Sequence, residues 1–367
     1  MSKLDEARLI INDVDKKMAD LFKERMKAAK MVAEYKKENG LPILDAKREE
    51  AVVNKNSEYI QDNEILNYYQ EFIKNTMAVS RKYQHKLING ARVAYSGVEG
   101  AFAYIAASRV FPDGELISYD SFNSAYDAVV KGECDYCVLP IENSYAGEVG
   151  QVTDLMFNGP LSITGVYSLP IVHNLLGTPD ALITDIKKVV SHPQALSQCA
   201  NYIEDHGFKQ ENMVNTAVAA KYVASTNDKT IGAIASRDTA KLYGLKVLDH
   251  DINESSSNTT RFAVFTKYPT NSKTDDTFIL LFTVTNTAGS LAKAIDIIGK
   301  WGYNMKSLRS RPMKSLAWEY YFYIEASGNP HTIEGEKMFE ELKSVCDRIK
   351  VVGTFKDNVA TIDLKED

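Results

Sequence analysis

Charged side chains recur at helical spacing in the first part of the chain, and they are of the types that hold anions. Arg25 and Lys36 are eleven positions apart, which at about 100° per residue leaves them roughly 20° from a common helix face. Arg8 points about 100° away from Arg25 on the same predicted helix. Arg8 therefore suits a ligand held elsewhere, such as one bound to a partner chain.

A second polar group follows a glycine–proline turn. Asp45, Arg48 and Glu49 stand at the i, i+3, i+4 spacing that shares one helix face, and Ser80 and Gln84 are again i, i+4. Any one of these residues is explained by a solvated helix face, and Asp45 also by a role in capping the second helix. The set as a whole predicts a polar site on the helices.

In type and order, all eight residues match the all-helical chorismate mutase family, which the segment resembles over residues 1–88. The resemblance implies an intertwined homodimer in which Arg8 enters the partner's site. Arg8, Arg25 and Arg48 would then hold the two carboxylates of chorismate, because guanidinium groups bind carboxylates through two parallel hydrogen bonds.

The same resemblance implies the remaining roles in this site. Chorismate rearranges in one pericyclic step, which needs a compact pose and stabilisation of the charge that grows as the ether bond breaks. Lys36 and Gln84 would donate to the ether oxygen. Glu49, with Asp45 nearby, would accept from the ring hydroxyl, and Ser80 would contact a carboxylate.

Four short patterns in the middle of the chain leave a predicted strand or enter a helix or strand, where open α/β sheets place their ligands. They are YSGVEGAF (95–102), LPIENSYAG (139–147), VVSHPQALSQC (189–199) and SSSNTTRF (255–262). Each alone is an ordinary turn or cap. Together they resemble the prephenate dehydratase family over residues 91–267, which implies two α/β lobes with the site in the cleft between them.

This resemblance implies Thr260 as the hydroxyl that donates a proton and Arg261 as the cation for a substrate carboxylate. The other residues implied for the substrate site are Glu142, Asn143, His192, Gln194 and Asn258. With a net charge of −6, the chain offers no general basic field, so we expect a few placed cations to meet the carboxylates. The chain departs from the family at Ala103, where a hydroxyl-bearing residue is frequent.

The last segment resembles the ACT domain, which follows prephenate dehydratases and binds phenylalanine. The residues that the resemblance implies for the effector are Ala288, Gly289, Ser290, Leu291, Asn304, Ser310, Arg311 and Pro312. The chain has Arg309 where the family commonly has Glu, which reverses a charge beside the expected pocket. The alternative is a ferredoxin-like dimerisation domain that binds no effector.

Hydrophobic periodicity predicts the elements that must position these residues. Three helices are expected, over about 4–37, 44–53 and 63–86. The first, roughly 50 Å long, cannot bury its apolar stripe without a partner chain. A β/α alternation follows, typical of an open α/β fold, and then a ferredoxin-like βαββαβ order. The sequence therefore predicts three domains, over 1–89, 91–268 and 276–356.

Composition narrows the functional classes. The hydrophobic fraction of 44% and the charged fraction of 25% are typical of a globular protein, and the negative net charge disfavours nucleic-acid and membrane partners. The first residues lack the features of a signal peptide, and no apolar run approaches the ~18 residues that span a bilayer. Four cysteines make no disulfide framework, and six histidines show no ligand spacing. We therefore expect a cytoplasmic enzyme without metal or cofactor.

With these three segments in this order, the chain resembles bifunctional chorismate mutase/prephenate dehydratases with a C-terminal ACT domain. This resemblance implies conversion of chorismate to prephenate and of prephenate to phenylpyruvate in phenylalanine biosynthesis, with feedback inhibition by phenylalanine. Two other interpretations stay open. Two hinged α/β lobes are also typical of a small-molecule binding or sensor protein, and the helices could form a dimerisation bundle without an active site. Arogenate is an alternative dehydratase substrate.

Overall fold

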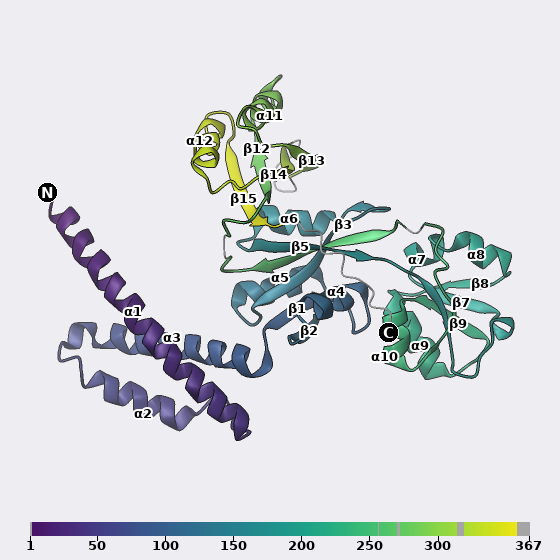
Figure 1. The fold of residues 1–367 in the computed structure, drawn as a ribbon, viewed down its shortest axis with the longest axis horizontal. Coiled ribbons are helices and arrows are strands. Elements are labelled where there is room, and N and C mark those ends of the chain that lie inside the picture. The colour runs from purple at the N-terminus through teal and green to yellow at the C-terminus, as the bar shows by residue number, and fades with distance from the viewer. Residues whose placement is uncertain (1, 256, 270–271, 314–318, 358–367) are drawn as a thin grey trace. The chain divides into compact units, whose positions relative to one another are not determined.

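The computed structural model describes residues 2–255, 257–269, 272–313 and 319–357, and the ribbon in Figure 1 follows them from purple to yellow. The chain divides into two compact units, one formed mainly by residues 1–91 and one by the rest of the chain. Among the described residues, no helix is long and apolar enough to cross a membrane.

The first unit is helical, as the sequence predicted. Its helices are α1 (Lys3–Glu38), α2 (Ala46–Ser57) and α3 (Asn63–Asn89). Ser2 and Asp5 form a capping box at the start of α1, and the Asp45 carboxylate accepts from the backbone N–H of Arg48 at 3.0 Å at the start of α2. These caps satisfy N–H groups that have no partner within the helix, which fixes where each helix begins.

Helix α1 buries little of its apolar face within the unit. Only Ala29 and Ala33 are buried along its 36 residues, and both lie in its second half. Ile10 is 66% exposed and Leu21 is 64% exposed, although their spacing makes them part of one apolar stripe. An exposed apolar stripe of this length is typical of an interaction surface.

The second unit contains two α/β lobes. Lobe 1 has a sheet of strands β1 (Arg92–Ser96), β2 (Glu115–Tyr119), β3 (Tyr136–Asn143), β5 (Ser162–Pro170) and β11 (Thr259–Thr266), in the order β5-β11-β3-β1-β2. The short strand β4 (Gly147–Glu148) pairs with β3. Its helices are α4 (Phe102–Val110), α5 (Phe122–Lys131) and α6 (Gly150–Asn158).

Lobe 2 is inserted between β5 and β11, so the chain crosses between the lobes twice. Its five-stranded sheet has the order β10-β6-β9-β7-β8, from β6 (Asn174–Gly177), β7 (Lys188–Ser191), β8 (Lys209–Asn212), β9 (Ile231–Ala235) and β10 (Lys246–Asp249). The helices are α7 (Pro193–Ser197), α8 (Ala200–Asp205), α9 (Thr216–Thr226) and α10 (Arg237–Tyr243), with a 3₁₀ turn at Ile183–Asp185.

The C-terminal module, residues 277–355, has the predicted βαββαβ order. Its elements are β12 (Thr277–Thr283), α11 (Ser290–Lys300), β13 (Met305–Pro312), β14 (Tyr320–Ser327), α12 (Ile333–Leu342) and β15 (Arg348–Phe355). Strand β15 lies parallel to β5, with Gly353 opposite Ile163, so the module continues the sheet of lobe 1. A Cβ atom at Gly353 would lie 2.0 Å from the Ile163 carbonyl oxygen, so only glycine allows this approach.

Candidate functional site

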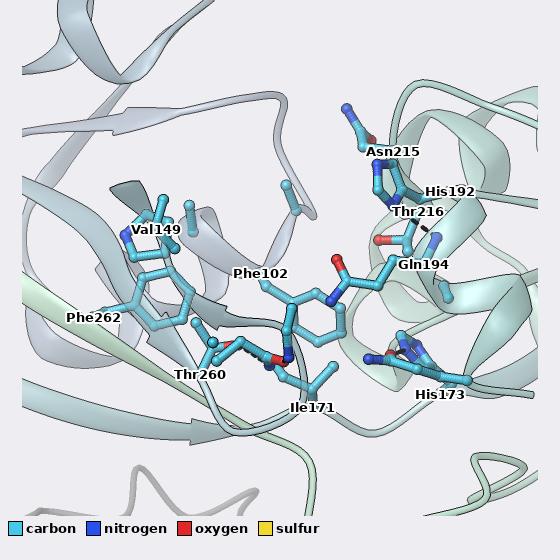
Figure 2. Close-up of a pocket in the computed structure, with 18 of the residues that line it drawn as sticks. Phe102, Val149, Ile171, His173, His192, Gln194, Asn215, Thr216, Thr260 and Phe262 are labelled. Carbon is cyan, nitrogen blue, oxygen red and sulfur yellow. Dashed lines mark hydrogen bonds between the residues drawn. The ribbon is translucent and has the colours of Figure 1, made fainter. Parts of the chain in front are cut away.

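A cavity of about 370 Å³ lies between the two lobes. Lobe 1 contributes Phe102, Asn143, Thr260 and Phe262 to its lining, and lobe 2 contributes His173, His192, Gln194, Gln198 and Thr216. Figure 2 shows Thr260 and Phe262 on one side, facing Gln194, His192 and Thr216 on the other. The volume is that of a small-molecule site, and the polar groups come from segments far apart in sequence.

The described residues that line this cavity include no lysine or arginine. Several helices instead begin at it, and two of these, α4 and α6, have no side-chain cap. Ala101 precedes α4 and Val149 precedes α6; both line the cavity, and neither side chain caps its helix. The N–H groups of these first turns and the positive end of each helix are available to an anion. None of the cations expected to meet the substrate therefore lies in the lining of this cavity.

Thr260 and Asn143 are cross-strand neighbours at the ends of β11 and β3. The Asn143 amide nitrogen donates to the Thr260 Oγ at 2.9 Å, and both residues are at most 9% exposed. No acceptor among the described residues takes the Thr260 proton. Because Oγ already accepts, the hydroxyl is left as a donor at the cavity wall.

Arg261 lies outside the cavity lining, contrary to the role that the sequence suggested. Its guanidinium forms two hydrogen bonds of 2.9 and 2.8 Å with the carboxylate of Glu325, on β14, and lies 3.4 Å from Glu142. Successive side chains of a strand point to opposite faces, so Thr260 and Arg261 cannot share a site. Glu142 follows the same rule and faces Arg261, whereas Asn143 lines the cavity.

The other residues predicted for this site divide in the same way. His192 and Gln194 line the cavity; the His192 Nδ1 accepts from the Gln194 backbone N–H at 3.2 Å and thereby caps α7. Asn258 is buried behind the lining, where its amide nitrogen donates to Gln198 at 3.0 Å. Ala103 lines the cavity as an apolar contact.

Sequence reasoning missed several buried residues of this lining, among them His173 and Gln198. Gln198 stands one turn after Gln194 in the same pattern, so its spacing could have indicated it. His173 follows a strand without any recognisable motif, and only the fold brings it to the cavity.

In the helical unit, α1 and α3 bring several predicted residues together. The Arg25 guanidinium donates to the Ser80 hydroxyl and lies 3.4 Å from the Thr76 carbonyl oxygen. Burial lowers the pKa of Arg25, which is the effect of a cation that lacks a counter-ion. The Gln84 Oε1 is buried without a hydrogen-bond partner in the part of the chain that the structure describes. These groups can bind a ligand that carries both negative charge and a donor.

The remaining predicted residues of this unit have other contacts or none. Glu49 pairs with Arg81, a residue that sequence reasoning did not select, and the Lys36 ammonium donates to the Ile43 carbonyl at 2.5 Å. Arg48 and Asp45 meet through the cap of α2. Arg8 lies on the exposed first half of α1, where the structure describes no ion pair for it. A hollow of about 470 Å³ borders Glu49 but none of the predicted arginines.

Comparison with known proteins assigns both units. The family model for chorismate mutase type II matches residues 7–85, and that for prephenate dehydratase matches residues 93–270. The bifunctional chorismate mutase/prephenate dehydratase of Aquifex aeolicus (strain VF5) is 30% identical over 97% of this chain and 98% of its own length. The chain belongs to the bifunctional chorismate mutase/prephenate dehydratase family. Its helical unit is the mutase, and its two lobes are the dehydratase.

Solved structures support the assignment of the dehydratase fold. The prephenate dehydratase of Staphylococcus aureus subsp. aureus Mu50 is 26% identical with a TM-score of 0.65, over 72% of this chain and all of that one. The prephenate dehydratase of Arthrobacter aurescens, solved in complex with L-Phe, is 24% identical with a TM-score of 0.66, over 72% of this chain and 89% of that one, and shows the fold alone.

The C-terminal module of this bifunctional enzyme contacts the dehydratase through charged groups. Arg309 pairs with Glu142, and its guanidinium lies 5.4 Å from the ring centre of Tyr323. Arg311 donates to Asp154 at 3.2 Å and lies 3.5 Å from Glu148 of the cavity lining. Both arginines therefore lie on the face of β13 that meets lobe 1.

The other residues predicted for an effector lie at the surface of the C-terminal module. Asn304, Ser310 and Pro312 are exposed on or beside β13, which is an edge strand of the sheet. The second group, Ala288, Gly289, Ser290 and Leu291, forms the turn into α11, where Gly289 has a φ of +84°. Arg311 is thus separated from this set by the strand itself.

The Arg261–Glu325 pair gives a stability prediction. Burial opposes the charge of Arg261, but the hydrogen bonds and attraction of Glu325 outweigh it and raise the pKa of Arg261. Glu325→Gln should therefore lower the free energy of unfolding by about 3 kcal/mol, because it leaves a buried cation short of its partner. The double variant Arg261→Met/Glu325→Leu should lose less. Urea denaturation measures both.

Glu340→Gln is the matched control, because its partner Lys343 and the carboxylate itself are largely exposed. It should leave the urea midpoint nearly unchanged. A double variant that is less stable than Glu325→Gln would contradict the claim that the pair is held mainly by mutual neutralisation.

Proposed function

We propose that the cavity between the lobes binds prephenate and that Thr260 donates a hydrogen bond to the ring hydroxyl as it departs. The observation that carries this is the Asn143–Thr260 hydrogen bond, whose direction leaves the Thr260 proton for the substrate. Prephenate loses this hydroxyl together with CO2, and the electrons of the broken C–C bond complete the aromatic ring. A donor aimed at the departing oxygen stabilises the charge that grows there.

The carboxylates of prephenate are proposed to lie at the first turns of α4 and α6. Ala101, Ala103 and Val149 line the cavity at these turns, and no side-chain cap occupies the first N–H groups of α4 or α6. Glu148 is the charged residue among the described lining residues, and Arg311 neutralises it from the C-terminal module. His192 and Gln194 then contact the substrate from lobe 2.

Replacing Thr260 should separate the two activities. We expect Thr260→Ala to reduce formation of phenylpyruvate at least 100-fold, because a donor in a water-excluded site is worth about that factor, while chorismate still disappears at the wild-type rate. Thr259→Ala is the control, since its side chain points away from the Asn143 amide and has no hydrogen bond among the described residues. A Thr260→Ala variant with full dehydratase activity would remove Thr260 from this role.

For the mutase we propose a site shared between two chains. Arg25 and Ser80 form its centre, Gln84 and Lys36 supply donors for the ether oxygen, and the partner's α1 supplies Arg8. The exposed apolar stripe of α1 supports this assembly, because a second helix that covers the stripe brings its own Arg8 to the site. The Gln84 Oε1, a buried acceptor without a partner among the described residues, supports the location and leaves the amide Nε2 as the donor.

Subunit mixing tests the shared site. Arg8→Ala and Arg25→Ala should each lose roughly 10²–10³-fold in mutase activity, since an arginine opposite a desolvated carboxylate contributes about 3–5 kcal/mol. When the two variants are unfolded and refolded together, half of the dimers are mixed, and each mixed dimer has one intact site. Mutase activity should therefore recover to roughly a quarter of the wild-type value.

Mixing Arg25→Ala with Arg48→Ala is the matched control. Both residues serve the site of their own chain, so every site in this mixture keeps one lesion, and no activity should return. Recovery in the control, or none in the first mixture despite demonstrated subunit exchange, contradicts the shared site.

We further propose that the C-terminal module is an ACT domain that binds phenylalanine and inhibits the dehydratase. The exposed turn at Gly289 and the exposed face of β13 would hold the effector, against a second copy of the module. The opposite face of β13 carries Arg309 and Arg311, whose ion pairs reach Glu142 and the cavity residue Glu148. A shift of β13 on effector binding would move charges that contact the dehydratase.

Calorimetry tests the effector. Phenylalanine should bind the wild-type chain and lower dehydratase activity, and prephenate should weaken phenylalanine binding by the same factor. Gly289→Ala should weaken binding about tenfold, because the positive φ costs a side chain 1–2 kcal/mol and relief of this strain would displace the turn that holds the effector. Gly299→Ala, in the same helix with no neighbour within 4 Å of the new Cβ, should bind normally. Absence of any binding heat in the wild type contradicts the sensing role.

A further inference from the structure

Five side chains form a continuous row of hydrogen bonds beneath the cavity. The row begins at Thr260, which accepts from Asn143 at 2.9 Å, and Asn143 also donates to the Asn258 Oδ1 at 2.9 Å. Asn258 donates in turn to the Gln198 Oε1 at 3.0 Å, and the His173 Nε2 lies 2.9 Å from the same oxygen. All five residues are at most 9% exposed, so water does not compete for these bonds.

The direction of every bond in this row is set at one end. The Asn143 Oδ1 accepts from the backbone N–H groups of Tyr145 and Ala146, at 3.0 and 2.8 Å, so its nitrogen must face Thr260 and Asn258. Asn258 must then present its oxygen to Asn143 and its nitrogen to Gln198. Gln198 must present its oxygen inward, because two amide nitrogens cannot hydrogen-bond to each other.

His173 closes the row, and its tautomer follows from the same reasoning. Its Nε2 faces an acceptor, the Gln198 Oε1, so Nε2 must carry the proton and Nδ1 must be a bare lone pair. The Nδ1 atom is buried without a partner among the described residues. Burial lowers the pKa of His173, and its ring contacts Phe102 edge-on at 5.9 Å, so the imidazole stays neutral.

The row of hydrogen bonds determines which atom of the Gln198 amide is free to contact a ligand. With its oxygen held by two donors, the Gln198 amide group has its N–H₂ left over, and no acceptor in the described part of the chain takes it. Gln198 therefore faces the cavity as a donor, as Thr260 does at the other end of the row. A cavity lined without cations thereby gains a second fixed donor for an anionic substrate.

We propose that His173 is a positioning residue of the dehydratase, whose Nε2 proton holds the Gln198 amide with its N–H₂ toward the substrate. The proposal rests on the proposed function of the cavity as the prephenate site. His173 acts on the reaction only through Gln198. Without the His173 imidazole, the Gln198 Oε1 keeps one hydrogen bond, from Asn258, and the Gln198 side chain gains rotational freedom. Loss of the His173 hydrogen bond should therefore lower the dehydratase activity and leave the mutase activity unchanged.

A double-mutant cycle measures this coupling. His173→Leu should lower dehydratase kcat/KM about tenfold or more, whereas His173→Gln, which retains an N–H donor of similar reach, should stay within about threefold of wild type. In a Gln198→Ala background, His173→Leu should change kcat/KM less than twofold. The matched control His331→Leu, an exposed histidine of the C-terminal module, should behave as wild type.

The tautomer supplies a readout on the wild-type chain, for which a variant serves only to assign the signal. Nitrogen NMR of the histidine-labelled wild-type chain, with His173→Gln to assign the signal among six histidines, should show the proton of His173 on Nε2. A proton on Nδ1, a His173→Leu variant as active as wild type, or equal losses with and without Gln198 would each overturn the proposal. A wild-type chain that does not turn over prephenate would instead overturn the function of the cavity.

Discussion

The alternation of side chains along β11 is the constraint on which the dehydratase depends. Thr260 and Phe262 face the cavity, so Arg261 between them must face the opposite side of the sheet, where Glu325 of the C-terminal module neutralises it. The partner strand β3 repeats this division with Asn143 and Glu142. One pair of strands therefore presents neutral side chains to the cavity and charged side chains to the neighbouring module.

On the function proposed for the cavity, this division explains how it would serve a dianion without cations in its wall. A buried arginine needs a counter-ion in the empty enzyme, and such a partner would compete with the substrate. Helix N-termini and oriented amides carry partial charges that need no counter-ion, so the empty cavity is stable. The cations are used instead between modules, where Arg309 and Arg311 meet carboxylates that are always present.

The sequence was sufficient to predict those elements and site residues that depend on local chemistry. The three helices of the first unit and the βαββαβ order of the C-terminal module were predicted, and the family resemblance selected Asn143, His192, Gln194 and Thr260, which the fold brings to one cavity. Short polar strands such as β8 escaped prediction because none of its residues is buried, so no hydrophobic alternation marks it. The face that Arg261 occupies and the arrival of His173 depend on pairing between distant strands, which a motif does not show.

The mutase solves the same problem of binding a dianion in the opposite way, and its reaction explains the difference. A pericyclic step needs strong charge complementarity but no directed proton, so side-chain cations suffice. Those cations must be kept apart until the substrate arrives. Arg25 within one chain meets only the neutral oxygens of Ser80 and Thr76, and Arg8 stands on an exposed helix whose apolar stripe needs another chain. On the proposal of a shared mutase site, assembly of two chains would complete a site whose charges would repel one another on a single surface.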